Sequence, residues 1–167
     1  MPDAVFAPLV KMSGLQFGFS KSRLVTLAVL ICGVAQARTV NLSHIASHVP
    51  GAALHSSNYR RLQRFFQHER LDGDATARLI VRLLNHARPR RLALDRTNWK
   101  LGGRDINVLV LAIVTRRFRV PLMWVQLGRA GNSDTGQRIA LMQRYLGLFG
   151  AGSIELVLAD REFIGAE

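Results

Sequence analysis

The spacing of apolar residues changes from a helical period to an extended one near Arg91. Before this point, apolar residues recur at helical spacing in four segments, 23–37, 41–49, 58–69 and 74–87. After it, the segment 105–115 reads DINVLVLAIVT, a β-branched run typical of a strand that is buried on both faces. A helical first part followed by a sheet-containing second part is therefore expected.

The basic link ARPRR at 87–91 contains Pro89, which cannot continue a helix. We place the domain boundary there, between a helical region (1–91) and a second region (92–167). The second region predicts strands at 92–100, 105–115 and 122–127, a helix at 135–149 capped by Asn132, Ser133 or Asp134, and a last strand from Ile154. The sequence thus predicts an α/β fold with the order strand, strand, strand, helix, strand.

The chain is strongly basic. Its 23 Lys and Arg, most of them Arg, against 11 Asp and Glu give a net charge of +12. Residues 1–93 carry 13 basic and 4 acidic side chains, whereas residues 94–167 carry 10 and 7. Arginine suits bidentate contacts with phosphate and with guanine edges, so nucleic acid is the leading class of partner. A basic ribosome-associated protein is also compatible with this charge.

The short helix at 41–49, a turn at Pro50 and Gly51, and the basic helix at 58–69 make a candidate helix-turn-helix. Ser56 or Ser57 is expected to cap the second helix. Its predicted inward face is formed by Tyr59, Leu62, Phe65 and Phe66, and its DNA-binding face by Arg60, Arg61 and Arg64. The alternative is a helical hairpin with a solvated arginine face.

One apolar segment has features of an export signal, because it follows Lys21 and Arg23 and its end, Ala35-Gln36-Ala37, resembles a signal-peptidase site. Cys32 is the only cysteine, which excludes an intramolecular disulfide and favours a reducing, cytoplasmic location. The apolar run 24–37 is about 14 residues long, too short to span a bilayer, and we interpret it as a buried helix.

Two carboxylates follow apolar strand segments: Asp95 comes after Leu92–Leu94, and Asp160 after Leu156–Ala159. If the two strands are neighbours, these acids converge. Two buried carboxylates at close range repel each other unless a cation lies between them, and Mg²⁺ or Mn²⁺ is the natural ion for such a site. The alternative is that each acid pairs with an arginine, since Arg96 and Arg161 are adjacent in sequence.

Three segments carry a family resemblance: LALDRTNWK from Leu92, GRDINVLVLAIV from Gly103, and LVLADREF from Leu156. Together they resemble DDE transposases of bacterial insertion sequences, which have a ribonuclease H-like core. The resemblance implies that Asp95 and Asp160 are the first and second catalytic, metal-binding acids, and that Arg161 lies near the DNA backbone. It also implies DNA strand cleavage and transfer at the terminal repeats of an element, supported by two metal ions in a homodimeric or synaptic assembly.

The sequence departs from this family in one respect. The third acid of the family lies in a Tyr-Arg-Glu-Lys motif, which this sequence does not contain, and Glu162 and Glu167 are too near Asp160 to replace it. We therefore expect the first part of a transposase, with an incomplete ribonuclease H-like mixed sheet and no activity of its own. A non-catalytic DNA-binding protein that represses or competes with an intact transposase, and a metal-dependent nuclease of the same fold, are the alternatives.

Overall fold

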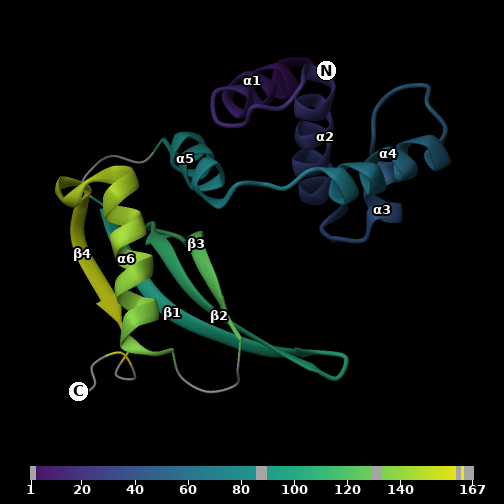
Figure 1. Ribbon diagram of the computed structural model, residues 1–167. Coiled ribbons are helices and arrows are strands. Elements are labelled where there is room, and N and C mark those ends of the chain that lie inside the picture. Colours follow the sequence, from purple (N-terminus) through teal and green to yellow (C-terminus); the bar gives the residue numbers. More distant parts are fainter. Residues whose placement is uncertain (1–2, 86–89, 129–132, 161–162, 164–167) are drawn as a thin grey trace. The chain divides into compact units, whose positions relative to one another are not determined.

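The computed structural model describes residues 3–85, 90–128, 133–160 and 163 (Figure 1). These residues form an α/β protein whose four strands belong to a single mixed sheet. The chain divides into two compact units, residues 1–75 (unit 1) and residues 76–167 (unit 2). This division falls at the first turn of a helix, whereas we had placed the domain boundary after Arg91. Part of the basic link at 87–91 lies outside the described residues.

Unit 1 contains four helices: α1 (Asp3–Gly14), α2 (Lys21–Ala37), α3 (Leu42–Ser47) and α4 (His55–His68). Helix α2 is the apolar segment expected from the sequence, and Arg38, with φ 50°, ends it in the left-handed conformation. The middle of α2 is buried on all sides, since each residue from Thr26 to Leu30 is buried, with Ala28 fully inaccessible. None of the helices in the described ranges combines the length and the apolar character needed to cross a membrane.

The two helices expected to form the helix-turn-helix differ in how they begin. The Asn41 side chain accepts hydrogen bonds from the amides of Ser43 (2.9 Å) and His44 (3.4 Å), so it caps α3 as predicted. Helix α4 begins earlier than predicted, after Leu54, which provides no side-chain cap. The prediction that Ser56 or Ser57 caps α4 is therefore wrong, because both serines lie within its first turn.

The inward face of α4 is also narrower than predicted. Leu62 and Phe65 are buried, but Phe66 is 57% exposed and Tyr59 is only half-buried. Phe66 points about 100° away from Phe65 around the helix axis, and the side of α4 that is buried is the one that carries Leu62 and Phe65.

Unit 2 is built on the sheet. Its elements are α5 (Gly73–Leu84), β1 (Arg90–Leu101), β2 (Arg104–Val114), β3 (Arg119–Leu127), α6 (Thr135–Phe149), a 3₁₀ turn at Ala151–Ser153, and β4 (Ile154–Ala159). The strand order is β3-β2-β1-β4: β2 pairs antiparallel with both β1 and β3, and β4 pairs parallel with β1. The predicted succession of three strands, a helix and a strand is confirmed.

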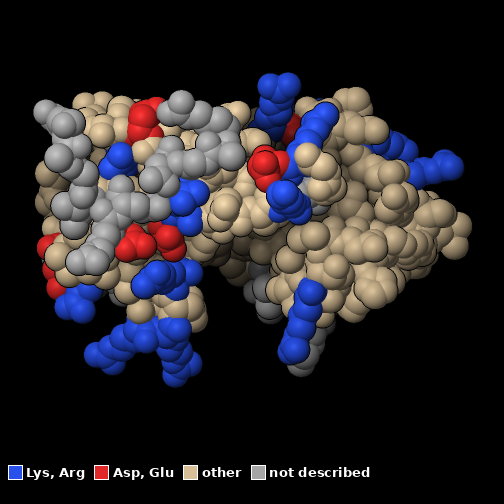
Figure 2. Space-filling model, turned by 90° about the horizontal axis from the view of Figure 1, so that it is seen from below, with Lys and Arg blue, Asp and Glu red and all other residues tan. Residues whose placement is uncertain are grey.

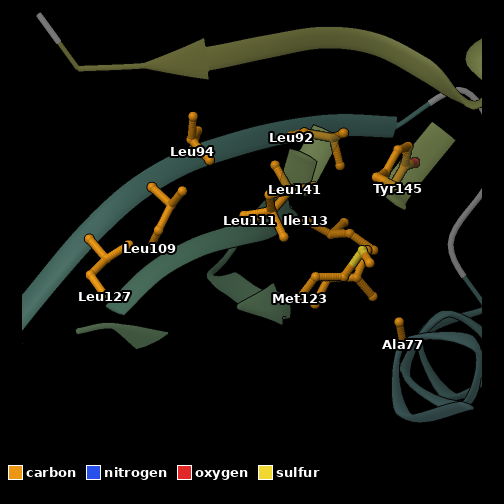
Figure 3. Close-up of a cluster of buried hydrophobic side chains, with 11 residues drawn as sticks. Ala77, Leu92, Leu94, Leu109, Leu111, Ile113, Met123, Leu127, Leu141 and Tyr145 are labelled. Carbon is orange, nitrogen blue, oxygen red and sulfur yellow. The ribbon is translucent and has the colours of Figure 1, made fainter. Parts of the chain in front are cut away.

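The core of unit 2 lies on one face of the sheet (Figure 3). Alternate residues of β1 and β2, among them Leu92, Leu94, Leu109 and Leu111, meet Leu141 and Tyr145 of α6 there. Ala77 of α5 belongs to the same cluster. Fully burying an apolar side chain of this size contributes about 1.5–3 kcal/mol, so this single layer of contacts orients α6 on the sheet.

Helix α6 is fixed at both ends. Asp134 Oδ1 accepts from the Gln137 amide (2.7 Å) and Gln137 Oε1 accepts from the Asp134 amide (3.1 Å), which forms a capping box. At the other end, the buried Tyr145 hydroxyl lies 3.0 Å from Ser153 Oγ, in the turn that leads into β4. The path from α6 into β4 is therefore set by specific polar contacts.

The opposite face of the sheet is less covered than the sequence suggested. The segment 105–115 was expected to be buried on both faces, but in β2 fully buried residues mostly alternate with half-buried ones. The last strand was expected to be buried, yet β4 is an edge strand of the described sheet, and Leu156 (47%) and Leu158 (42%) are exposed. Both expectations of burial are wrong, because an apolar run specifies a strand but not what covers it.

Candidate functional site

The sheet brings the two predicted acids together. Leu94 of β1 is paired with Ala159 of β4, and Asp95 and Asp160 are the next residues along these parallel neighbours. Both acids line one pocket of about 390 Å³, whose other lining residues are Ala93, Leu94, Leu158, Ala159 and Arg119. The expectation that the acids converge if their strands are adjacent is consistent with this arrangement.

The acids are not buried, contrary to the argument that first singled them out. The Asp95 side chain is 62% exposed, and Asp160 is also exposed. Asp95 Oδ1 accepts a hydrogen bond from the Arg96 amide (2.8 Å). The burial of the acids is therefore no argument for a bound cation in this pocket. The remaining argument for a cation is that two carboxylates lie near each other.

Arg119 of β3, which the sequence analysis missed, lies at the same pocket. Its Nη1 is 4.0 Å from Asp95 Oδ2, and its side chain is 64% exposed. No sequence signal marked this residue, because its approach to Asp95 depends on the pairing of β3 with β2. Arg161, predicted to act near DNA, lies outside the described residues.

A second arginine, Arg138 of α6, contacts Phe163, which is hydrogen-bonded to Asp160. Phe163 donates its amide hydrogen to the Asp160 carbonyl (2.9 Å). Arg138 Nη1 donates to the Phe163 carbonyl (3.0 Å) and Nη2 donates to the Ser133 carbonyl (3.0 Å), while the guanidinium lies 5.7 Å from the Phe163 ring centroid. These contacts link Asp160, through Phe163 and Arg138, to the start of α6.

The carboxylates of Asp95 and Asp160 are suitable ligands for magnesium, but they are only two in number. Carboxylate oxygens are hard ligands, and Mg²⁺ commonly uses one or two of them and keeps several waters. Over the described ranges, no group of three or more His, Cys, Asp or Glu side chains forms a metal-binding cluster. Glu162 and Glu167 lie outside those ranges.

Two exposed tryptophans lie on the same face of the sheet as Asp95. Asp95 is paired with Val110 of β2, and Val110 with Trp124 of β3, so the three residues form one row across the strands. Trp99, paired with Ile106, lies farther along the β1–β2 hairpin. Each tryptophan side chain is 49% exposed.

The three arginines expected to form one DNA-binding face of α4 are not equivalent. Arg60 is exposed, whereas Arg61 is half-buried and its Nε donates to Thr26 Oγ1 of α2 (2.8 Å). Arg61 and Arg64 line a pocket between α2 and α4, and Arg60 does not. The three arginines therefore do not share one environment, because the position of Arg61 on the helix turns it toward α2.

Comparison of the chain with protein-family models, with curated proteins and with solved structures gives no significant match.

Proposed function

We propose that this protein binds DNA and carries a metal-dependent phosphodiester-processing core of the DDE transposase type, whose full activity is strand cleavage and transfer at element ends. The observation that supports it best is that Asp95, in the middle of β1, and Asp160, directly after β4, line one pocket beside these two parallel, adjacent strands. Because Mg²⁺ is commonly held by one or two carboxylates together with substrate phosphates, two carboxylates at this position suit a cation bound against a phosphodiester.

The sheet topology supports a ribonuclease H-like core. Three antiparallel strands in the order β3-β2-β1, followed by a helix and a strand β4 parallel to β1, place the first strand at the centre and the fourth beside it. That order lets residues far apart in the sequence form one site. An aspartate in the first strand and another at the end of the fourth is the pattern that suggested the fold from the sequence.

Asp95 and Asp160 would hold Mg²⁺ or Mn²⁺, which supplies an activated water and stabilises charge on phosphodiester oxygens when bound. The Arg119 guanidinium beside Asp95 would then face the negative backbone of a DNA substrate. Arg161 is proposed for the same role. On the face shown in Figure 2, Lys and Arg side chains are more widespread than Asp and Glu, which also favours a polyanionic partner.

The test is calorimetric titration of the purified chain with Mn²⁺. We expect a weak site that Asp95→Asn and Asp160→Asn each weaken about tenfold or more, since each change removes a charged ligand. Asp105→Asn is the matched control, because Asp105 is also exposed but is paired with Lys100 at the far end of β1. Equal losses in all three variants, or a loss in none, would contradict the proposed site.

A non-catalytic DNA-binding protein is the second candidate, favoured by the exposure of both acids and by Arg119 lying beside Asp95. A binder and a metal enzyme differ in one measurable respect. The binder would retain its full affinity for DNA in a chelating buffer and show no Mn²⁺ site, whereas the proposed core would bind Mn²⁺ through both acids. A nuclease of the same fold would cleave DNA without requiring terminal repeats.

A further inference from the structure

Unit 1 contains a pocket of about 470 Å³ that lies between the first turns of α2 and one side of α4. Its lining includes the guanidinium groups of Arg23, Arg61 and Arg64, the imidazole of His68, and the hydroxyl groups of Ser22, Thr26 and Ser57. Glu69 is the one acid among the residues that line it. Three arginines from two helices thus converge on one concave surface, which would cost electrostatic free energy unless an anion lay nearby.

Two of the three guanidinium groups of this pocket, those of Arg23 and Arg61, are held in place by contacts that leave donors available. Arg23 Nε lies 2.6 Å from Glu69 Oε1, and the Glu69 side chain is only 8% exposed. Arg61 is held through Nε by Thr26 Oγ1, which in turn donates to the Ser22 carbonyl (2.9 Å). A guanidinium held by its Nε still has its Nη hydrogens to donate.

Glu69 is paired with Arg23, whereas Arg61 and Arg64 have no carboxylate partner among the described residues. The positive end of the α2 dipole lies beside the same pocket, since Ser22 and Arg23 belong to the first turn of α2. After Glu69 neutralises Arg23, two arginine charges remain in the pocket.

We infer that this pocket binds one phosphate group of a DNA backbone, with Arg61 and Arg64 as the charged donors and Ser22 and Ser57 as neutral ones. This inference rests on the proposed DNA-binding function and specifies the part of unit 1 that carries it. Arginine forks match phosphate oxygens in pairs, and the prior fixing of Arg61 by Thr26 lowers the entropy lost on binding. Arg60, outside the pocket, would contribute only long-range attraction.

The experiment compares two neighbouring arginines that carry the same charge. Arg64→Ala and Arg60→Ala both remove one positive charge from an exposed position of α4, but only Arg64 lines the pocket. Binding of a labelled DNA duplex is measured over a range of salt concentrations. In parallel, inorganic phosphate is titrated while the arginine Nε–Hε signals are followed by NMR, and thermal melting confirms that both variants are folded.

We expect Arg64→Ala to weaken duplex binding about tenfold or more, the usual loss for a hydrogen bond to a charged group. It should also lower the slope of the log–log salt plot by about 0.9, as for one phosphate contact. Arg60→Ala should change the affinity several times less. Inorganic phosphate should shift the Arg61 and Arg64 signals of the wild type and of Arg60→Ala, with Arg64→Lys intermediate in duplex affinity.

Each contrary outcome has a separate meaning. Equal losses of duplex affinity in the two alanine variants would overturn the pocket as a DNA-phosphate site while leaving DNA binding by the chain intact. Phosphate-induced shifts together with equal duplex losses would also overturn it, because the pocket would then take free phosphate and not DNA. An absence of duplex binding by the wild type would instead refute the proposed function itself.

Discussion

Arg119 Nη1 on β3 lies 4.0 Å from Asp95 Oδ2 on β1, although the whole of strand β2 separates the two residues in the sheet. The rows between them carry small side chains, Ala93 and Ala112, which pair with each other on the same face. A long side chain can therefore pass over β2 and reach the candidate site. The cation and the acid are both largely exposed, so solvent screens their attraction.

We expect Arg119→Gln to strengthen Mn²⁺ binding a few-fold, since a guanidinium near Asp95 repels an incoming divalent cation. The gain should be larger at low ionic strength, where the repulsion is least screened. Calorimetry at two ionic strengths measures it, with Arg104→Gln on the distant β1–β2 hairpin as a control for net charge. An equal gain in the control would show that Arg119 acts only through the overall charge.

Gly33 of α2 is expected to tolerate no larger residue. A Cβ added there would lie 2.6 Å from Cγ2 of Ile45, and the Ile45 side chain is only 1% exposed, so it has little room to move. Gly33→Ala should therefore lower the free energy of unfolding by about 1–3 kcal/mol.

Gly147 is the matched control for that change, because it also lies inside a helix and is exposed, and a Cβ added there would meet no other atom within 4 Å. Gly147→Ala should raise the free energy of unfolding by about 0.5–1 kcal/mol. Chemical denaturation of both variants measures the two effects, and the same sign for both would contradict the packing of α2 against α3.

The ion pair between Arg91 and Glu155 links β1 to the edge strand. Arg91 donates to Glu155 Oε1 through Nε (2.9 Å) and Nη2 (2.8 Å). These hydrogen bonds lower the pKa of Glu155 from its ordinary value of 4.5. The resulting stability is present above pH 4.5 and is lost as the pH falls through the lowered value.

Arg91→Gln should therefore move the pKa of Glu155 back toward 4.5, and any difference in melting temperature from the wild type should disappear in acid. Both groups are exposed, so the difference at neutral pH should be small and should decrease with salt. An NMR titration of the Glu155 side chain follows the change directly. An unaltered titration midpoint would show that the two side chains do not pair in solution.

Cys32 on α2 should react slowly with thiol reagents in the folded protein. It is half-buried, and burial raises the pKa of its thiol above the ordinary value of 9.0. Less thiolate is then present at neutral pH, and the thiolate is the reactive form. Alkylation by iodoacetamide, followed by mass spectrometry, should be several-fold slower than in denaturant; equal rates would contradict this placement of α2.

Local signals in the sequence predicted the helices where polar caps define them. Helix α6 has the predicted bounds, 135–149, because Asp134 caps its start and Gly150 follows its end. Helix α4 starts after Leu54, which has no capping side chain, so its first residues could not be recognised. Apolar and β-branched runs predicted the strands, although the covering of β4 depends on what packs beside it.

Only part of the candidate site could be predicted from the sequence. Asp95 and Asp160 were identified because each follows an apolar strand, yet their exposure could not be predicted without knowing that β4 is an edge strand of the described sheet. Arg119 and the pocket between α2 and α4 depend on contacts between residues distant in sequence. Periodicity carries no information on such contacts.

The edge position of β4 makes the two halves of the candidate site unequal in their local stability. Asp95 lies on a strand with neighbours on both sides, whereas the strand leading to Asp160 is hydrogen-bonded only to β1 in the described sheet. Edge strands fray more readily than central ones, and hydrogen exchange detects such openings. A cation that bridged both acids would stabilise the pairing of β4 with β1. It would be released each time β4 opened, and its binding would slow amide exchange along that strand.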